Sequence, residues 1–117
     1  MVIIDKRKDP IEKVTLELKI IGMMADQSHL SDIDKLPPDI LAQFRKMNIL
    51  LINAEITKSV PIESMSEQVF DEIMGVNFNG AYFTLSRFIP ILNKGASVIF
   101  LSPTSATISP PMASVYV

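Results

Sequence analysis

Cysteine and tryptophan are absent from the 117-residue sequence, and histidine occurs once, at His29. The lack of cysteine excludes disulfides and thiolate metal sites, and it fits a reducing compartment. A lone histidine in a polar stretch beside Ser28 is more typical of a solvated loop than of a metal ligand, so we expect no metal site. The four glycines form no cluster of the kind that cradles phosphate groups.

Charge of either sign is also sparse, with 11 Lys and Arg against 13 Asp and Glu. The basic residues gather only at positions 6–8, which is too little to form a nucleic-acid-binding face. No apolar run is long enough to cross a membrane or to form the core of a signal peptide. We therefore expect a cytoplasmic chain without a nucleic-acid or membrane partner, folded as one domain over residues 1–117.

Four short and continuously apolar runs predict strands of a buried parallel sheet. The runs cover residues 2–4, 20–25, 49–52 and 98–101. Between them, apolar residues recur every three or four positions, which predicts helices over residues 9–18, 31–47 and 66–92. This alternation predicts an α/β fold in which helices cover both faces of the sheet, giving three layers.

Local signals place the ends of these helices. Asp9 and Ser66 are expected to cap the first and third helices. Pro37 and Pro38 should interrupt the second helix, because proline lacks the backbone N–H that an interior turn needs. Gly95 should end the third helix.

Polar side chains follow the predicted strands, at the edge where ligands bind in open parallel sheets. They are Asp5, Asp26, Asn53 and the hydroxyl-rich segment that begins at Ser102. A simpler interpretation is that the two carboxylates are solvated and that Asn53 satisfies backbone groups of a turn.

Three motifs, in order, resemble the short-chain dehydrogenase/reductase family. Residues 49–56, Ile-Leu-Leu-Ile-Asn-Ala-Glu-Ile, are similar to the family strand that ends in Asn-Asn-Ala-Gly. Residues 70–80 resemble its helix with Val-Asn-x-x-Gly, and residues 97–116 resemble its segment from the catalytic Ser to the catalytic Tyr. Their spacing agrees over essentially the whole chain, and it implies a partial Rossmann-like, doubly wound sheet.

The resemblance implies an oxidoreductase that moves a hydride between NAD or NADP and a small alcohol or ketone. It implies that Asp26 contacts the adenine ring and that Asn53 and Ala54 lie along the cofactor. It places Asn77 in the catalytic tetrad and makes Tyr116 the acid/base. Without the resemblance, Asn77 on an apolar helix face would be interpreted as a buried, hydrogen-bonded structural residue, and Tyr116 would carry no functional meaning.

The chain departs from the family pattern near Tyr116. The position 13 residues before it, where the catalytic Ser is expected, is Pro103. A shift of one residue would let Ser102 or Thr104 polarise the substrate carbonyl, and we take Ser102 as the candidate.

Two larger parts of the family pattern are missing from the sequence. One is the first strand with its glycine-rich turn, which holds the pyrophosphate, so we expect weakened cofactor binding. The other is the Lys that lowers the pKa of the catalytic Tyr, so we expect impaired or absent turnover by this segment. The first strand normally lies between the second and fourth, and later strands extend the sheet. Unpaired strand edges predict self-association.

The preference between NAD and NADP depends on residues 5–7. A carboxylate at Asp5 accepts from a ribose 2′-hydroxyl and repels a 2′-phosphate, whereas Lys6 and Arg7 would accommodate that phosphate. We favour NAD slightly.

Three hypotheses follow. The first is a segment of a short-chain dehydrogenase whose intact parent is active. The second is a non-catalytic truncated remnant or interaction module. It is favoured by Ile52 in place of the first Asn of the Asn-Asn-Ala-Gly motif, Glu55 in place of its Gly, and Pro103 in place of the catalytic Ser. The third is a small binding domain of flavodoxin or receiver type, which four strands with alternating helices permit. The series Asn53, Asn77 and Tyr116 argues against the third.

Overall fold

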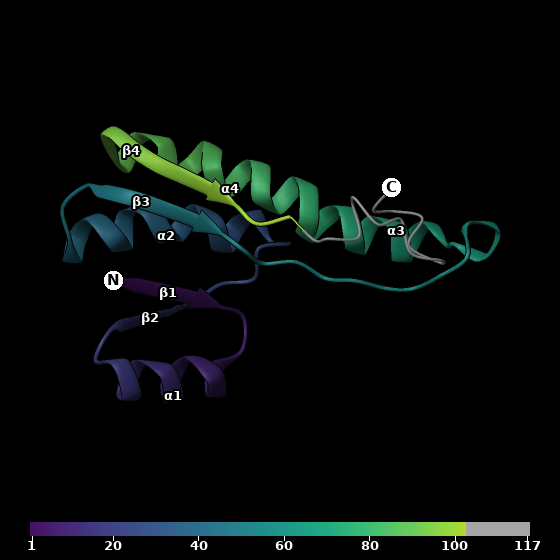
Figure 1. Ribbon diagram of the computed structural model, residues 1–117, viewed down its shortest axis with the longest axis horizontal. Coiled ribbons are helices and arrows are strands. Elements are labelled where there is room, and N and C mark those ends of the chain that lie inside the picture. The colour runs from purple at the N-terminus through teal and green to yellow at the C-terminus, as the bar shows by residue number, and fades with distance from the viewer. Residues whose placement is uncertain (103–117) are drawn as a thin grey trace.

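The computed structural model of the chain describes residues 1–102, which form four parallel strands and their connecting helices (Figure 1). The strands are β1 (Val2–Asp5), β2 (Ile21–Met24), β3 (Met47–Ile52) and β4 (Leu92–Phe100). β1 pairs with β2 and β3 pairs with β4, both in parallel. The predicted parallel α/β arrangement is confirmed.

The strands form two separate two-stranded sheets, in the order β1-β2 and β3-β4. β1 lies between β2 and β3 in Figure 1, so the edge of β1 that has no strand partner within residues 1–102 faces β3. This is the position at which the family resemblance predicts an absent strand.

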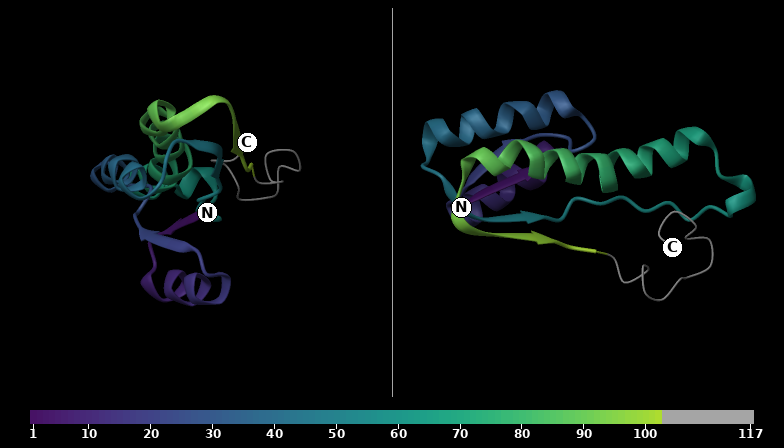
Figure 2. Two further views of the ribbon diagram at one scale, coloured as in Figure 1. Left: turned by 90° about the vertical axis from the view of Figure 1, so that its left-hand side faces the viewer. Right: turned by 90° about the horizontal axis from the view of Figure 1, so that it is seen from above.

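Helices connect the strands and carry the rest of the described chain. They are α1 (Lys8–Leu18), α2 (Leu30–Gln43), the short turn η1 (Ile62–Ser64), α3 (Glu67–Met74), the π-helical turn η2 (Gly75–Gly80), α4 (Ala81–Phe88) and η3 (Ile89–Ile91). α3, η2 and α4 follow one another as a single long helix, seen side-on in the right-hand view of Figure 2. Within the described residues, no helix is both long and apolar enough to cross a bilayer.

Three predictions about the helices were wrong. Arg7, not Asp9, precedes α1, and Asp9 lies in the first turn, where its charge still favours the helix N-terminus. α2 runs through Pro37 and Pro38 without a break, and Pro37 is among its buried residues. Gly95 does not end the third helix, because α4 ends at Phe88, the turn η3 continues to Ile91, and Gly95 lies within β4.

The early start of β4 follows from an irregular pairing with β3. Met47 pairs with Leu92 and Ile49 pairs with Ser97, so residues 93–96 of β4 lie opposite a single residue of β3. A bulge of this kind is set by the partner strand, which local sequence does not reveal. Ser66, in contrast, caps α3 as predicted, with its hydroxyl accepting a hydrogen bond from the N–H of Val69 at 3.3 Å.

The core lies between β3 and the pair of helices α2 and α4. Leu50 and Ile52 of β3 face this core and are buried. The buried cluster consists of Ala25, Leu36, Ile40, Leu50, Ile52, Phe88 and Ile91. Ile49 and Leu51 point to the other face of the same strand, where they are 64% and 54% exposed. One face of β3 is therefore covered within residues 1–102, although the apolar run predicts cover on both.

We expect Ile40→Ala to lower the free energy of unfolding by about 2–5 kcal/mol, because Ile40 is 1% exposed and the change leaves a cavity. Leu41→Ala is the matched control on the same helix. Leu41 is 45% exposed, so this change should alter stability by less than about 0.5 kcal/mol. Urea unfolding followed by circular dichroism measures both, and equal losses would contradict the position of the core.

Candidate functional site

The carboxyl ends of all four strands meet at one edge of the molecule. The N–H of Ala25 donates to the carbonyl of Asp5 at 3.2 Å, joining the ends of β1 and β2. The N–H of Leu101 donates to the carbonyl of Ile52 at 3.1 Å, joining the ends of β3 and β4. Asp5, Asp26, Asn53 and Ser102, at or directly after the ends of the four strands, therefore lie at this edge.

Asp26 lies immediately after β2 in a tight turn. Its Oδ1 accepts hydrogen bonds from the backbone N–H and the hydroxyl of Ser28, at 2.9 and 2.7 Å, and Lys6 Nζ lies 3.6 Å from Oδ2. Partial burial acts to raise the pKa of Asp26, but the hydrogen bonds from Ser28, with the charges of Lys6 and of protonated His29, outweigh it. The pKa therefore lies below its usual value, and Asp26 is an anionic acceptor at neutral pH.

Asp5, at the end of β1, is held by Arg7. The guanidinium donates to both carboxylate oxygens at 3.1 Å, and the backbone N–H of Arg7 adds a bond of 2.9 Å to Oδ1. The side-chain hydrogen bonds from Arg7 are the main cause that lowers the pKa of Asp5. From the sequence, Asp5 favours NAD and Arg7 would favour NADP. The structure shows these two side chains bonded to each other.

Asn77 lies in η2, where the long helix changes its hydrogen-bonding register. Its Oδ1 accepts from the N–H of Ile56, and its Nδ2 donates to the carbonyl of Ile56, both at 2.9 Å. These two hydrogen bonds hold the loop after β3 against the helix. π-helical turns of this kind occur frequently at functional sites.

The remaining candidates differ in their surroundings. Asn53 and Ala54 follow β3 and are exposed, and Ser102 is exposed after β4. Tyr116, together with Pro103 and Thr104, lies outside the described residues.

One residue of the site, Gln27, is absent from the sequence-based candidates. Its side-chain amide donates to the carbonyls of Ala54 and Val76, at 3.3 and 2.9 Å. Its place directly after Asp26 is a weak signal, because local sequence gives no indication of partners 27 and 49 residues away.

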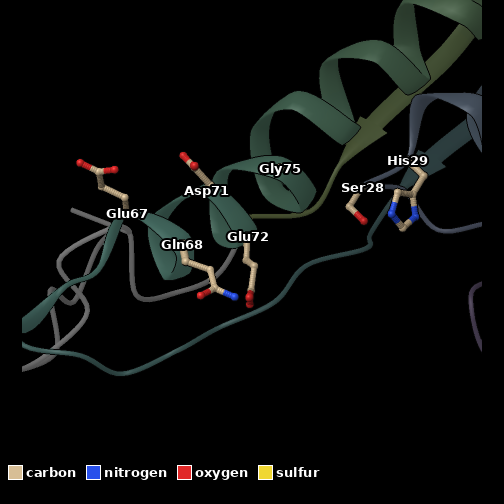
Figure 3. Close-up of a pocket in the computed structure, with 7 residues that line it drawn as sticks. All are labelled: Ser28, His29, Glu67, Gln68, Asp71, Glu72 and Gly75. Atoms are coloured by element: carbon tan, nitrogen blue, oxygen red, sulfur yellow. The ribbon is translucent and has the colours of Figure 1, made fainter.

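The larger of two described pockets lies beside this edge, between α3 and the start of α2 (Figure 3). It measures about 600 Å³ and is lined by Ser28, His29, Glu67, Gln68, Asp71, Glu72 and Gly75. None of the predicted site residues lines it. Its three carboxylates would repel a phosphate group, so it does not suit a dinucleotide. Within residues 1–102, no group of three or more His, Cys, Asp and Glu side chains could hold a metal ion.

Comparison with known proteins gives the same result as the motifs. The family model for short chain dehydrogenases matches residues 1–117. The chain belongs to the short-chain dehydrogenase family.

Among curated short-chain dehydrogenases, one from Aspergillus novofumigatus is 29% identical over 90% of this chain and 42% of its own length. A tropinone reductase homolog from Datura stramonium is 30% identical over 84% of this chain and 38% of its own length. The chain thus spans less than half the length of these two relatives.

The solved structures confirm the fold class, a partial doubly wound α/β sheet. The crystal structure of a 3-ketoacyl-(acyl-carrier-protein) reductase from Brucella melitensis, complexed with NADH, is 29% identical and superimposes with a TM-score of 0.90. The match covers 98% of this chain and 51% of that one.

Acid should destabilise the chain in part through Asp26. Its pKa is lower in the folded chain than in the unfolded one, so its contribution to stability is present above about pH 4 and is lost as the pH falls through the lowered pKa. We expect Asp26→Asn to be less stable than the wild type at pH 7 and to approach it at about pH 3. Urea unfolding at both pH values measures this difference. An Asp26→Asn deficit that persists at low pH would contradict the prediction.

Proposed function

We propose that this chain forms the nucleotide-binding edge of a nicotinamide-dependent oxidoreductase acting on a small alcohol or ketone. The observation that supports this function best is the convergence of Asp26, Ala54 and Asn77 at one strand edge. Hydrogen bonds between the two loops and the long helix hold these residues together. Membership of the short-chain dehydrogenase family supports the same reaction class.

The described residues fit the adenosine side of a dinucleotide. Asp26 offers a partly buried carboxylate, 23% exposed, which can accept from the adenine amino group. Asn53 and Ala54 are exposed beyond β3, where an extended dinucleotide can lie along them. Nicotinamide, when bound, accepts or supplies the hydride.

The chain's own residues would handle the substrate oxygen and its proton. Ser102 is exposed at the end of β4, and its hydroxyl can donate a hydrogen bond to a substrate carbonyl. Asn77 would hold the loop after β3 in register with the helix. We assign the proton transfer to the phenol of Tyr116, whose unperturbed pKa of about 10 requires a nearby positive charge for work at neutral pH.

We further propose a preference for NAD over NADP. The lowered pKa of Asp5 keeps it anionic at neutral pH, so that it would accept from a ribose 2′-hydroxyl and repel a 2′-phosphate. Arg7, which would attract that phosphate, is already bound to Asp5 through both carboxylate oxygens.

Calorimetric titration with NADH and NADPH tests this function on the 117-residue chain and on a version that carries the flanks of a full-length family member. We expect both forms to bind NADH more tightly than NADPH, and the longer form to bind more tightly than the shorter. No binding by either form would contradict the function and favour a non-catalytic interaction module.

Asp5→Ser extends the titration to cofactor choice. It removes the carboxylate and frees Arg7, so the ratio of NADPH to NADH affinity should rise by about tenfold. Asp9→Ser is the control, because Asp9 carries the same carboxylate but is exposed in α1, beyond the strand edge. An unchanged ratio in Asp5→Ser would contradict the role of this carboxylate.

We also propose that the chain associates with a second copy of itself through the edges of β1 and β3. An unpaired strand edge is a template for further pairing, and the exposed Ile49 and Leu51 add apolar surface beside it. Sedimentation velocity should show a concentration-dependent increase in mass. Leu51→Lys should weaken this association, whereas Leu41→Lys, equally apolar and exposed on α2, should not. A monomer at all concentrations would contradict the proposal.

A further inference from the structure

Gln27 occupies a junction between three segments that are far apart in the sequence. It belongs to the turn after β2, and its Nε2 donates to the carbonyl of Ala54 in the loop after β3 and to the carbonyl of Val76 in η2. Because both bonds start from one nitrogen, a single side chain fixes the distance between the other two segments.

The same two segments are joined a second time by Asn77 and Ile56. Val76 directly precedes Asn77, and Ala54 lies two residues before Ile56. The Gln27 bridge therefore runs beside the double hydrogen bond between Asn77 and Ile56. A change in the bridge would shift the backbone that presents Asn77.

We propose that Gln27 is a positioning residue that fixes Asn77 and Ala54 relative to each other. The relevance of this role to catalysis rests on the proposed oxidoreductase function. The geometric effect itself does not depend on any cofactor.

A primary amide of this length suits the chemistry of the junction. Both partners are carbonyl oxygens, which accept but cannot donate, and the two N–H groups of the Gln27 amide supply one hydrogen bond to each. Glutamate at neutral pH supplies none, and methionine has a similar shape but no donor. Either change would leave the carbonyls of Ala54 and Val76 without this partner.

Gly80 permits the close approach on which the bridge depends. A Cβ atom at Gly80 would lie 2.4 Å from the backbone oxygen of Gln27 and 2.5 Å from its Cγ, so an alanine there would displace Gln27. Gly75, in the same helical turn, has open space at the corresponding position. The two glycines thus offer a matched pair of variants.

The first experiment measures hydrogen exchange of backbone amides by NMR in the full 117-residue chain, without cofactor. In Gln27→Met we expect the protection of the Ile56 N–H, which is bonded to Asn77 Oδ1, to fall by about tenfold. The amide of Val14, in α1, should keep its protection. Gln43→Met is the matched control, because Gln43 is exposed and its amide donates to the carbonyl of Asp39 within α2. Unchanged protection of Ile56 in folded Gln27→Met would overturn the proposal.

Gln27→Glu tests the hydrogen bonds themselves, because acid should restore a donor in this variant. A role in packing alone would give no recovery of the Ile56 protection factor at low pH. At neutral pH its carboxylate faces two carbonyl oxygens, and Ile56 should lose protection as in the methionine variant. As the pH falls and the carboxyl is protonated, it regains one donor, so the protection factor of Ile56 should rise again. A protection factor that does not recover would count against a hydrogen-bonding role.

The glycine pair tests the same junction without changing Gln27. Gly80→Ala should reduce the protection of Ile56, whereas Gly75→Ala should leave it unchanged. Equal effects of the two variants would contradict the dependence on close approach.

A titration with NADH then separates this inference from the proposed function. Failure of the wild type to bind NADH, both as the 117-residue chain and with the added flanks, would overturn the function and leave the exchange result intact. If the wild type binds, Gln27→Met should bind about tenfold more weakly, since Ala54 and Asn77 are no longer held. Lost protection with unchanged NADH affinity would show that Gln27 does not position the cofactor edge.

Discussion

Parallel pairing of the strands is the constraint on which the site depends. The two strands of each pair run parallel, and Gln27 after β2 bonds to Ala54 after β3, so the polar residues that follow the strands collect at one edge (Figure 1). The hydrophobic core between β3, α2 and α4 fixes the position of β3 relative to these helices. The short loops then need to place only a few side chains, and the side-chain amides of Gln27 and Asn77 complete the arrangement.

The long helix contributes through its irregular turn. In a regular α-helix, side chains follow a fixed 100° rotation per residue, and the turn η2 interrupts that pattern at Asn77. The amide of Asn77 then meets both backbone groups of Ile56. Gly80, at the end of the same turn, allows the helix to approach Gln27 closely. Helix irregularity and close packing therefore act together at one place.

The sequence predicted what depends on short-range patterns. The apolar runs gave all four strands, and the Ser66 cap and the polar strand ends were read correctly, since each rests on neighbouring residues. The bulge between β3 and β4, the unbroken helix through Pro37 and Pro38, and the partners of Gln27 were not predicted. Each of these depends on contacts between segments that lie far apart in the chain, for which a local pattern gives no signal.

The two ends of the candidate site also differ in how far apart in the sequence their contacting residues lie. Asp5 and Asp26 are held by residues two positions away, Arg7 and Ser28. Asn77 is held across 21 residues. Local unfolding of the long helix would therefore break the hydrogen bonds between Asn77 and Ile56, while the turns that carry Asp5 and Asp26 would persist. The hydrogen bonds of Asp5 and Asp26 are thus largely local, whereas the contact between the loop after β3 and the long helix depends on the integrity of the whole fold.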